Sequence, residues 1–95
     1  MEITSGLIDA EQMHQRSPET FHLPGSLELL RVGDTIKVCR VKDGDPERFW
    51  VKLVAVTPTT LHGTVANHLM QNADLPYGAP LVCERRHVWD VEQRR

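Results

Sequence analysis

The sequence has little that would be expected of an exported or membrane protein. Cysteine is scarce: Cys39 and Cys83 are the only two among 95 residues, too few for a disulfide framework. No apolar run approaches the roughly 20 residues that a membrane-spanning helix needs, and residues 1–5 lack the basic start and apolar stretch of a signal peptide. We therefore expect a cytoplasmic protein with no membrane partner, in which both cysteines are reduced and buried.

Aromatic residues and an excess of positive charge are lacking too. The chain has two Trp, two Phe and one Tyr, and its net charge of −2 is divided unevenly, with −4 over residues 1–34 and +2 over residues 35–95. Nonspecific binding to nucleic acid needs a dense basic patch, because its affinity grows with each phosphate neutralised. A stacking platform for several bases needs more aromatic rings. The composition therefore disfavours a nucleic-acid-binding protein.

Close pairs of metal ligands and the common catalytic motifs are also missing. Zinc sites usually contain spacings such as Cys-x-x-Cys or His-x-x-x-His, and the five histidines and two cysteines form no such pair. The sequence has no phosphate-binding loop, no dinucleotide-binding fingerprint and no Gly-x-Ser-x-Gly motif. We expect no metal, no cofactor and no catalytic residue, so an enzyme or metal protein is the least favoured interpretation.

What the sequence does contain is alternation between apolar and polar residues from position 34 onward. This period of two indicates β-strands, and turn residues separate the alternating segments. Residues 43–46 form the strongest turn signal, and Pro46 is expected to lie in that turn because proline cannot extend a ladder. The expected strands cover residues 35–41, 48–56, 61–66, 81–85 and 86–91, the last combined with a turn.

The N-terminal third predicts one or two short helical turns. Asp9 is a candidate N-cap for a helix over residues 7–15, and Ser26 for a turn over residues 27–30 that ends at Gly33. Residues 92–95 are expected to fray. The predicted organisation is therefore a short N-terminal helix or partly ordered leader (1–17), one small β domain (18–91) and a tail (92–95).

Short strands joined by tight turns predict a mainly β fold. The connections are too short for parallel crossovers, so we expect a small antiparallel barrel of about five strands, either SH3-like or OB-like. Spacing alone does not choose between those two topologies. The expected core residues are Ile36, Val38, Phe49, Val51, Leu53, Leu61 and Val65.

Six short segments of the sequence together form a recognisable pattern. They are Pro18–Pro24, Gly33–Val38, Glu47–Leu53, Gly63–Asn67, Pro76–Gly78 and His87–Val91. The pattern resembles a group of small uncharacterised bacterial domains, some of whose relatives look like immunity proteins of polymorphic toxin systems. The sequence departs from that pattern after Asn67. The resemblance implies a mostly β fold and no established catalytic residue.

Binding residues are expected on the side of the 48–56 strand that faces away from the core. If Phe49, Val51 and Leu53 face the core, alternation turns Trp50 and Lys52 outward. An outward tryptophan beside basic residues can anchor a protein interface. The predicted partner-binding surface joins this strand to a basic corner further along the chain, and its residues are Trp50, Lys52, Arg85, Arg86 and His87.

The favoured function is a non-catalytic protein-interaction module, immunity-like or accessory to a mobile element, that binds and occludes a protein partner. In an alternative arrangement, Trp50 is not exposed but covers a second cluster with Val54, Val56 and Phe21, since large aromatic residues are usually buried. The second function is a nucleic-acid-binding small barrel, whose contacts would come from Lys37, Arg40, Lys42, Lys52, Arg85 and Arg86. The third is a small enzyme or metal protein, with Cys83 as a conceivable nucleophile.

Overall fold

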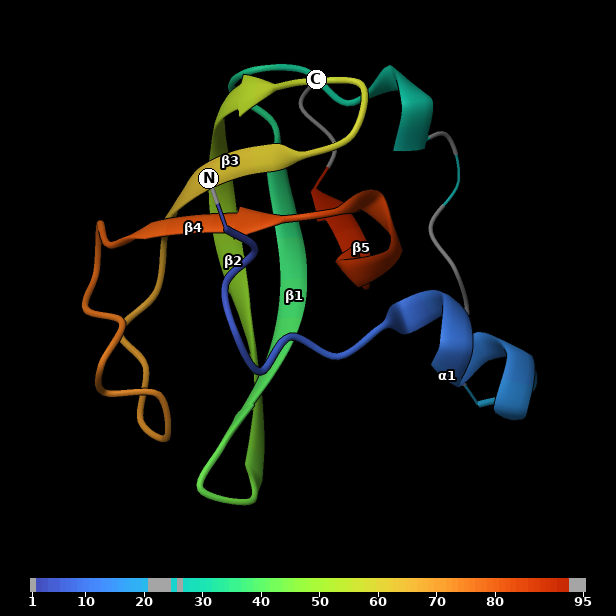
Figure 1. Cartoon of the computed structure of the whole chain (residues 1–95), viewed down its shortest axis with the longest axis horizontal. Helices are drawn as coiled ribbons and strands as arrows, with labels where there is room; N and C mark the ends of the chain where they lie inside the picture. Colours follow the sequence, from blue (N-terminus) through green and yellow to red (C-terminus); the bar gives the residue numbers. More distant parts are fainter. Residues whose placement is uncertain (1, 21–24, 26, 93–95) are drawn as a thin grey trace.

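The computed structural model describes residues 2–20, 25 and 27–92. Its main feature is one antiparallel sheet with the strand order β4-β3-β2-β1-β5 (Figure 1). The elements are α1 (Ala10–Arg16), the 3-10 turn η1 (Leu27–Leu29), β1 (Thr35–Lys42), β2 (Asp45–Val56), β3 (Leu61–Val65), β4 (Pro80–Cys83), the 3-10 turn η2 (Arg85–His87) and β5 (Asp90–Glu92). The predicted mainly β, antiparallel fold of five strands is confirmed, whereas closure into an SH3-like or OB-like barrel stays a prediction. Within the described residues, no helix is both long and apolar enough to cross a membrane.

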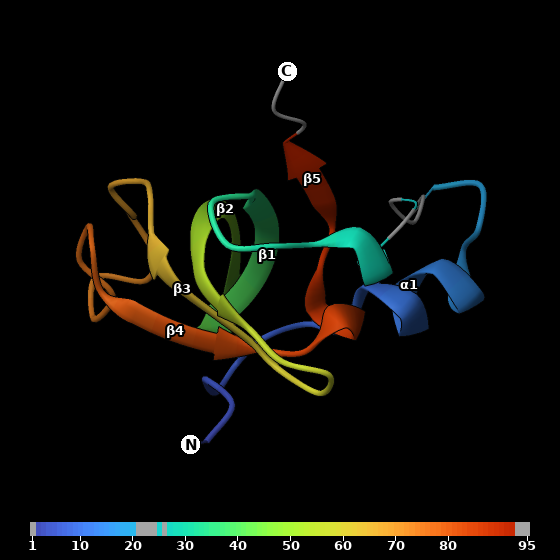
Figure 2. The same cartoon turned by 90° about the horizontal axis from the view of Figure 1, so that it is seen from above.

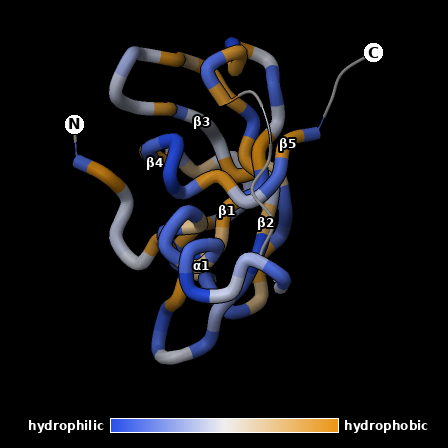
Figure 3. The backbone as a smooth tube through the Cα atoms, turned by 90° about the vertical axis from the view of Figure 1, so that its right-hand side faces the viewer, coloured by the Kyte–Doolittle hydropathy of each residue, from blue (hydrophilic) through white to orange (hydrophobic). Residues whose placement is uncertain are grey.

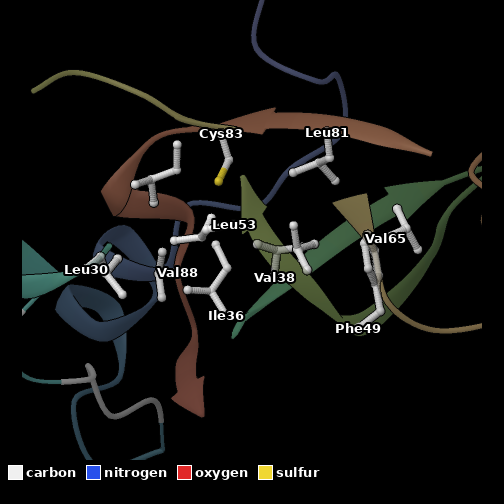
Figure 4. Packing of buried hydrophobic residues seen from close by; sticks show 11 residues of the cluster. Leu30, Ile36, Val38, Phe49, Leu53, Val65, Leu81, Cys83 and Val88 are labelled. Atoms are coloured by element: carbon white, nitrogen blue, oxygen red, sulfur yellow. The ribbon is translucent and has the colours of Figure 1, made fainter. Parts of the chain in front are cut away.

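The seven predicted core residues belong to one buried cluster, as expected. Figure 4 shows the cluster between the strands, in which Leu30, Leu81, Cys83 and Val88 join the seven predicted residues. Both cysteines are buried and free, and burial raises the pKa of the Cys83 thiol to about 12. The hydropathy of the chain follows the same division between core and surface. In Figure 3, hydrophobic segments (orange) gather where the strands meet, and α1 is mostly hydrophilic (blue).

The β1–β2 hairpin turns on two residues rather than four. Asp43 and Gly44 both have positive φ, 55° and 87°, as a tight two-residue hairpin turn requires. The prediction that Pro46 lies in the turn is wrong, because β2 already begins at Asp45 and Pro46 pairs with Val41. The Val41 N–H points away from β2 and donates to the carbonyl of Gly6 (2.9 Å), so this pair needs no hydrogen bond from proline.

The N-terminal segment extends along two strands of the sheet. The amide of Thr4 donates to the carbonyl of Val82 in β4 (2.8 Å), and the amide of Ile8 donates to the carbonyl of Cys39 in β1 (2.9 Å). Figures 1 and 2 show this segment passing across the sheet toward α1. Asp9 caps the helix through the Gln12 amide (2.9 Å) as predicted, although the helix spans 10–16 rather than 7–15. The predicted Ser26 cap lies outside the described residues, as do residues 93–95 of the predicted tail at 92–95, whereas Glu92 is the last residue of β5.

The loop between β3 and β4 is tied to the β1–β2 hairpin by two charged side chains. The Glu47 carboxylate accepts hydrogen bonds from the amides of Met70 (2.9 Å), Gln71 (2.9 Å) and Asn72 (3.1 Å). The Arg40 guanidinium donates to both carboxylate oxygens of Asp74 (2.8 and 3.0 Å). Arg40 and Glu47 face each other across the hairpin, so one cross-strand pair positions the whole loop.

Candidate binding surface

Alternation along β2 determines which side chains reach the surface of the sheet. Phe49, Val51 and Leu53 are buried in the core, and Arg48 and Lys52 on the opposite face are exposed. Trp50 lies between these two cations and is half-buried. The outward orientation predicted for Trp50 and Lys52 is therefore confirmed, whereas their role in binding stays a prediction.

Trp50 is held by groups from both neighbouring strands. Lys37 stands opposite it on β1, and the Lys37 Nζ lies 4.7 Å from the centroid of the indole ring. The Trp50 amide donates to Asn67 Oδ1 (2.6 Å), and the Trp50 carbonyl accepts from the Ala66 amide (2.9 Å). A cation over an indole ring is an attractive arrangement. In the alternative, Trp50 covers a second cluster with Val54, Val56 and Phe21. Val54 is exposed and Val56 packs against the core cluster, whereas Phe21 lies outside the described part of the chain.

A second tryptophan, Trp89, pairs with a cation in the same way. The guanidinium carbon of Arg48 lies 4.8 Å from the centroid of the Trp89 ring. The Trp89 amide donates to the carbonyl of Lys37 (2.8 Å), which fixes the residue before β5 beside β1. Its indole Nε1 donates to the carbonyl of Ile8 (3.4 Å). Sequence reasoning placed Trp89 only in a closing strand and missed this contact.

We call this surface the outer face. Its residues are Lys37, Arg48, Trp50, Lys52 and Trp89. It combines three cations with two indole rings, and exposed acidic residues border it on one side, because Asp90 and Glu92 lie in the edge strand β5. The face is therefore basic along β2 and acidic at the β5 edge.

The predicted basic corner at residues 85–87 is a different kind of site. The Arg85 guanidinium donates to three backbone carbonyls, those of Leu27 (3.4 Å), Thr57 (3.0 Å) and Pro58 (3.1 Å). It thereby joins η1 and the β2–β3 turn to η2. Replacing Arg85 is therefore expected to destabilise the fold, because a partly buried carbonyl that loses its hydrogen-bond donor is costly.

The other two residues of the corner also have partners within the chain. Arg86 is exposed and forms ion pairs with Glu84 (2.8 Å) and Asp9 (3.4 Å). His87 is only 4% exposed, so the expectation that it contributes to the surface is wrong. Its Nδ1 accepts a hydrogen bond from the Glu84 amide (3.0 Å). The 3-10 turn causes this, since it folds the His87 ring back under the chain instead of outward.

The buried His87 ring predicts a pH dependence of stability. Burial, reinforced by the positive charge of Arg86, lowers the pKa of His87 below its ordinary 6.5. The unfolded chain therefore binds the proton more readily, and the free energy of unfolding should decrease as pH falls below about 6.5. Urea unfolding at a series of pH values would measure this, and His87→Gln, which keeps an acceptor without titrating, should flatten the profile. An equally steep profile in that variant would contradict the assignment.

Within the part of the chain that the structure describes, no group of three or more His, Cys, Asp or Glu side chains could hold a metal ion. No protein-family model, curated protein or solved structure matches the chain. The resemblance to the bacterial immunity-like domains therefore stays a prediction. Function has to be inferred from the outer face itself.

Proposed function

We propose that this protein is a non-catalytic protein-binding module and that the outer face is its binding surface. The observation that carries the proposal is the pairing of two tryptophans with two cations on one face of the sheet, Lys37 with Trp50 and Arg48 with Trp89. Tryptophan and arginine are enriched among the residues that contribute most to protein interfaces. Lys37, Arg48 and Trp50 lie on strands and Trp89 directly precedes β5, so these side chains are held in place before binding, which reduces the entropy lost on association.

The proposal extends to the biological setting. Such a module acts by covering a surface of its partner, as an immunity-like protein or an accessory of a mobile element would do in a bacterial cytoplasm. Hydrogen bonds from residues 4–8 to both β4 and β1 support a small SH3-like barrel as its architecture. In that architecture the outer face is the exterior of the barrel wall.

Nucleic-acid binding is the second candidate, because the outer face also offers rings and cations for bases and phosphates. Much of the basic set expected for that function is engaged elsewhere. Arg40 is buried, Lys42 contacts Asp74 (3.2 Å), and Arg86 contacts Glu84. Arg85 donates to backbone carbonyls, and Lys37 stands opposite Asp90 of the acidic edge strand β5, which would repel a phosphate backbone. These contacts favour a protein partner.

A pair of charge reversals tests the proposed surface. Lys52→Glu changes an exposed residue of the outer face, and Arg16→Glu makes the same change of charge at an exposed position of α1. Cross-linking and pull-down from the native cell should recover a partner with the wild type and with Arg16→Glu, and recover about tenfold less with Lys52→Glu. Circular dichroism would verify that both variants fold.

Two outcomes would contradict the proposal. Equal recovery with Lys52→Glu and the wild type would show that the outer face is not the interface. Binding of unrelated DNA or RNA that weakens steeply as salt rises would instead favour the second candidate, because phosphate contacts release counterions.

A further inference from the structure

The side chains along the exposed side of β2 follow a regular order of charge. Arg48, Trp50 and Lys52 occupy every second position, so a ring stands between two cations. Successive residues on one side of a strand are about 6.5–7 Å apart, which places the two cations about 13–14 Å apart. An extended chain lying along β2 would have the same repeat.

Arg48 and Lys52 also differ in their partners from three of the other basic residues. Arg40, Lys42 and Arg86 each form an ion pair with an acidic side chain of this protein. Among the described residues, the ion pairs include neither Arg48 nor Lys52, and both side chains are exposed. They are therefore positioned to bind carboxylates supplied from outside. Arg48 also hydrogen-bonds the Cys39 side chain across the β1–β2 pair, and its guanidinium has further N–H donors for a carboxylate.

From this order we infer that the partner contributes an extended acidic segment with the pattern acid–x–apolar–x–acid, lying along the exposed side of β2. One carboxylate binds Arg48, the other binds Lys52, and the apolar residue packs on Trp50. The inference rests on the proposed protein-binding function. Because the pattern reads the same in both directions, the segment can run parallel or antiparallel to β2.

The distribution of charge favours a peptide over a polynucleotide as the occupant. A peptide with this pattern carries negative charge only at the two positions that meet cations. A polynucleotide carries one charge per nucleotide, and a strand crossing the sheet toward β5 would approach the exposed Asp90 and Glu92. Lys37, whose ammonium group contacts the Trp50 ring, adds a third positive charge that a carboxylate-bearing segment can approach.

Two synthetic peptides of identical composition test the spacing. The first has glutamates four residues apart with leucine midway between them, and the second has the glutamates two residues apart around the same leucine. The two tryptophans of the protein both lie in the outer face, so their fluorescence reports binding directly. We expect the first peptide to bind at least about tenfold more tightly than the second.

Variants of the protein test which of its residues contact the peptide. Lys52→Glu and Arg48→Glu should each weaken the first peptide by about tenfold, and Arg16→Glu should leave its affinity unchanged. Equal binding of both peptides would overturn the inferred spacing, and binding of neither would overturn the acidic segment. If a cellular partner is nevertheless captured through the outer face, the proposed function stands and only this inference fails. A single-stranded oligonucleotide that binds more tightly than either peptide would overturn both.

Discussion

Replacing Gly63 with alanine is expected to lower the free energy of unfolding by about 3 kcal/mol, because the sheet has no room for one more carbon. Gly63 is buried in β3 and pairs with Leu53 of β2. A Cβ at this position would lie 2.6 Å from the carbonyl oxygen of Lys52 and would also meet a methyl group of Val51. The Lys52 oxygen belongs to the backbone, so the strands themselves must move apart.

Urea denaturation would measure the effect of Gly63→Ala, and Gly25→Ala is the matched control. Among the described residues, a Cβ added at Gly25 would meet no heavy atom within 4 Å, so this replacement should change stability by less than about 0.5 kcal/mol. A similarly small change at Gly63 would show that β2 and β3 can separate locally at no cost. Movement of Val51 and Lys52 would also displace Trp50, so Gly63→Ala should weaken partner binding as well.

The strands themselves were largely predictable because β-structure leaves a local signal. The alternation through Ile36, Val38, Phe49, Val51 and Leu53 identifies both the strands and their buried side. The pairing of β2 with β3 is less regular, since β2 shifts its register between Leu53 and Ala55, next to the pair of Leu53 with Gly63.

The position of a residue within the β1–β2 ladder was not predictable in the same way. Whether Pro46 can join a ladder depends on which of its neighbours are hydrogen-bonded, and that follows from the length of the turn. A two-residue turn places Pro46 where no N–H is needed. The sequence alone identifies residues that favour a turn, but it does not determine how many of them form the turn.

The candidate site was only half predictable for a related reason. Alternation places Trp50 and Lys52 on one side of a strand, which is local information. The contact between Arg48 and Trp89 joins residues far apart in the chain, and it exists only because β5 returns to the edge of β1. Arg85 was predicted to lie on the binding surface, because nothing in the sequence indicates that backbone carbonyls accept hydrogen bonds from its side chain in the fold.

Removing the Arg40 side chain is expected to have an effect of similar size to that of Gly63→Ala, with Arg40→Ala lowering the free energy of unfolding by about 2–4 kcal/mol. The Arg40 side chain is only 8% exposed. It donates to the Ser5 carbonyl (2.7 Å), to Asn72 Oδ1 (3.2 Å) and to Asp74. Asn72 is fully buried, so its oxygen would lose a partner that water cannot readily replace.

The Arg40 guanidinium also lowers the pKa of an acidic side chain, and the pH dependence of stability therefore provides a second measurement of its role. Hydrogen bonds from Arg40, reinforced by Lys42, lower the pKa of Asp74 from its ordinary 3.8 to about 2. Ionised Asp74 therefore stabilises the fold fully above about pH 4, and this contribution is lost as pH falls toward 2. In Arg40→Ala only Lys42 remains near the carboxylate, so the acid dependence of stability in this range should become shallower.

Urea unfolding of four proteins, the wild type, Arg40→Ala, Asp74→Ala and the double variant, separates the pair from the rest of the network. If the Arg40–Asp74 contact fixes the β3–β4 loop, Asp74→Ala should cost much less in the Arg40→Ala background than in the wild type. Arg16→Ala, an exposed arginine on α1, is the control and should change stability by less than about 0.5 kcal/mol. Additive effects of the two substitutions would contradict the contact, because independent sites add.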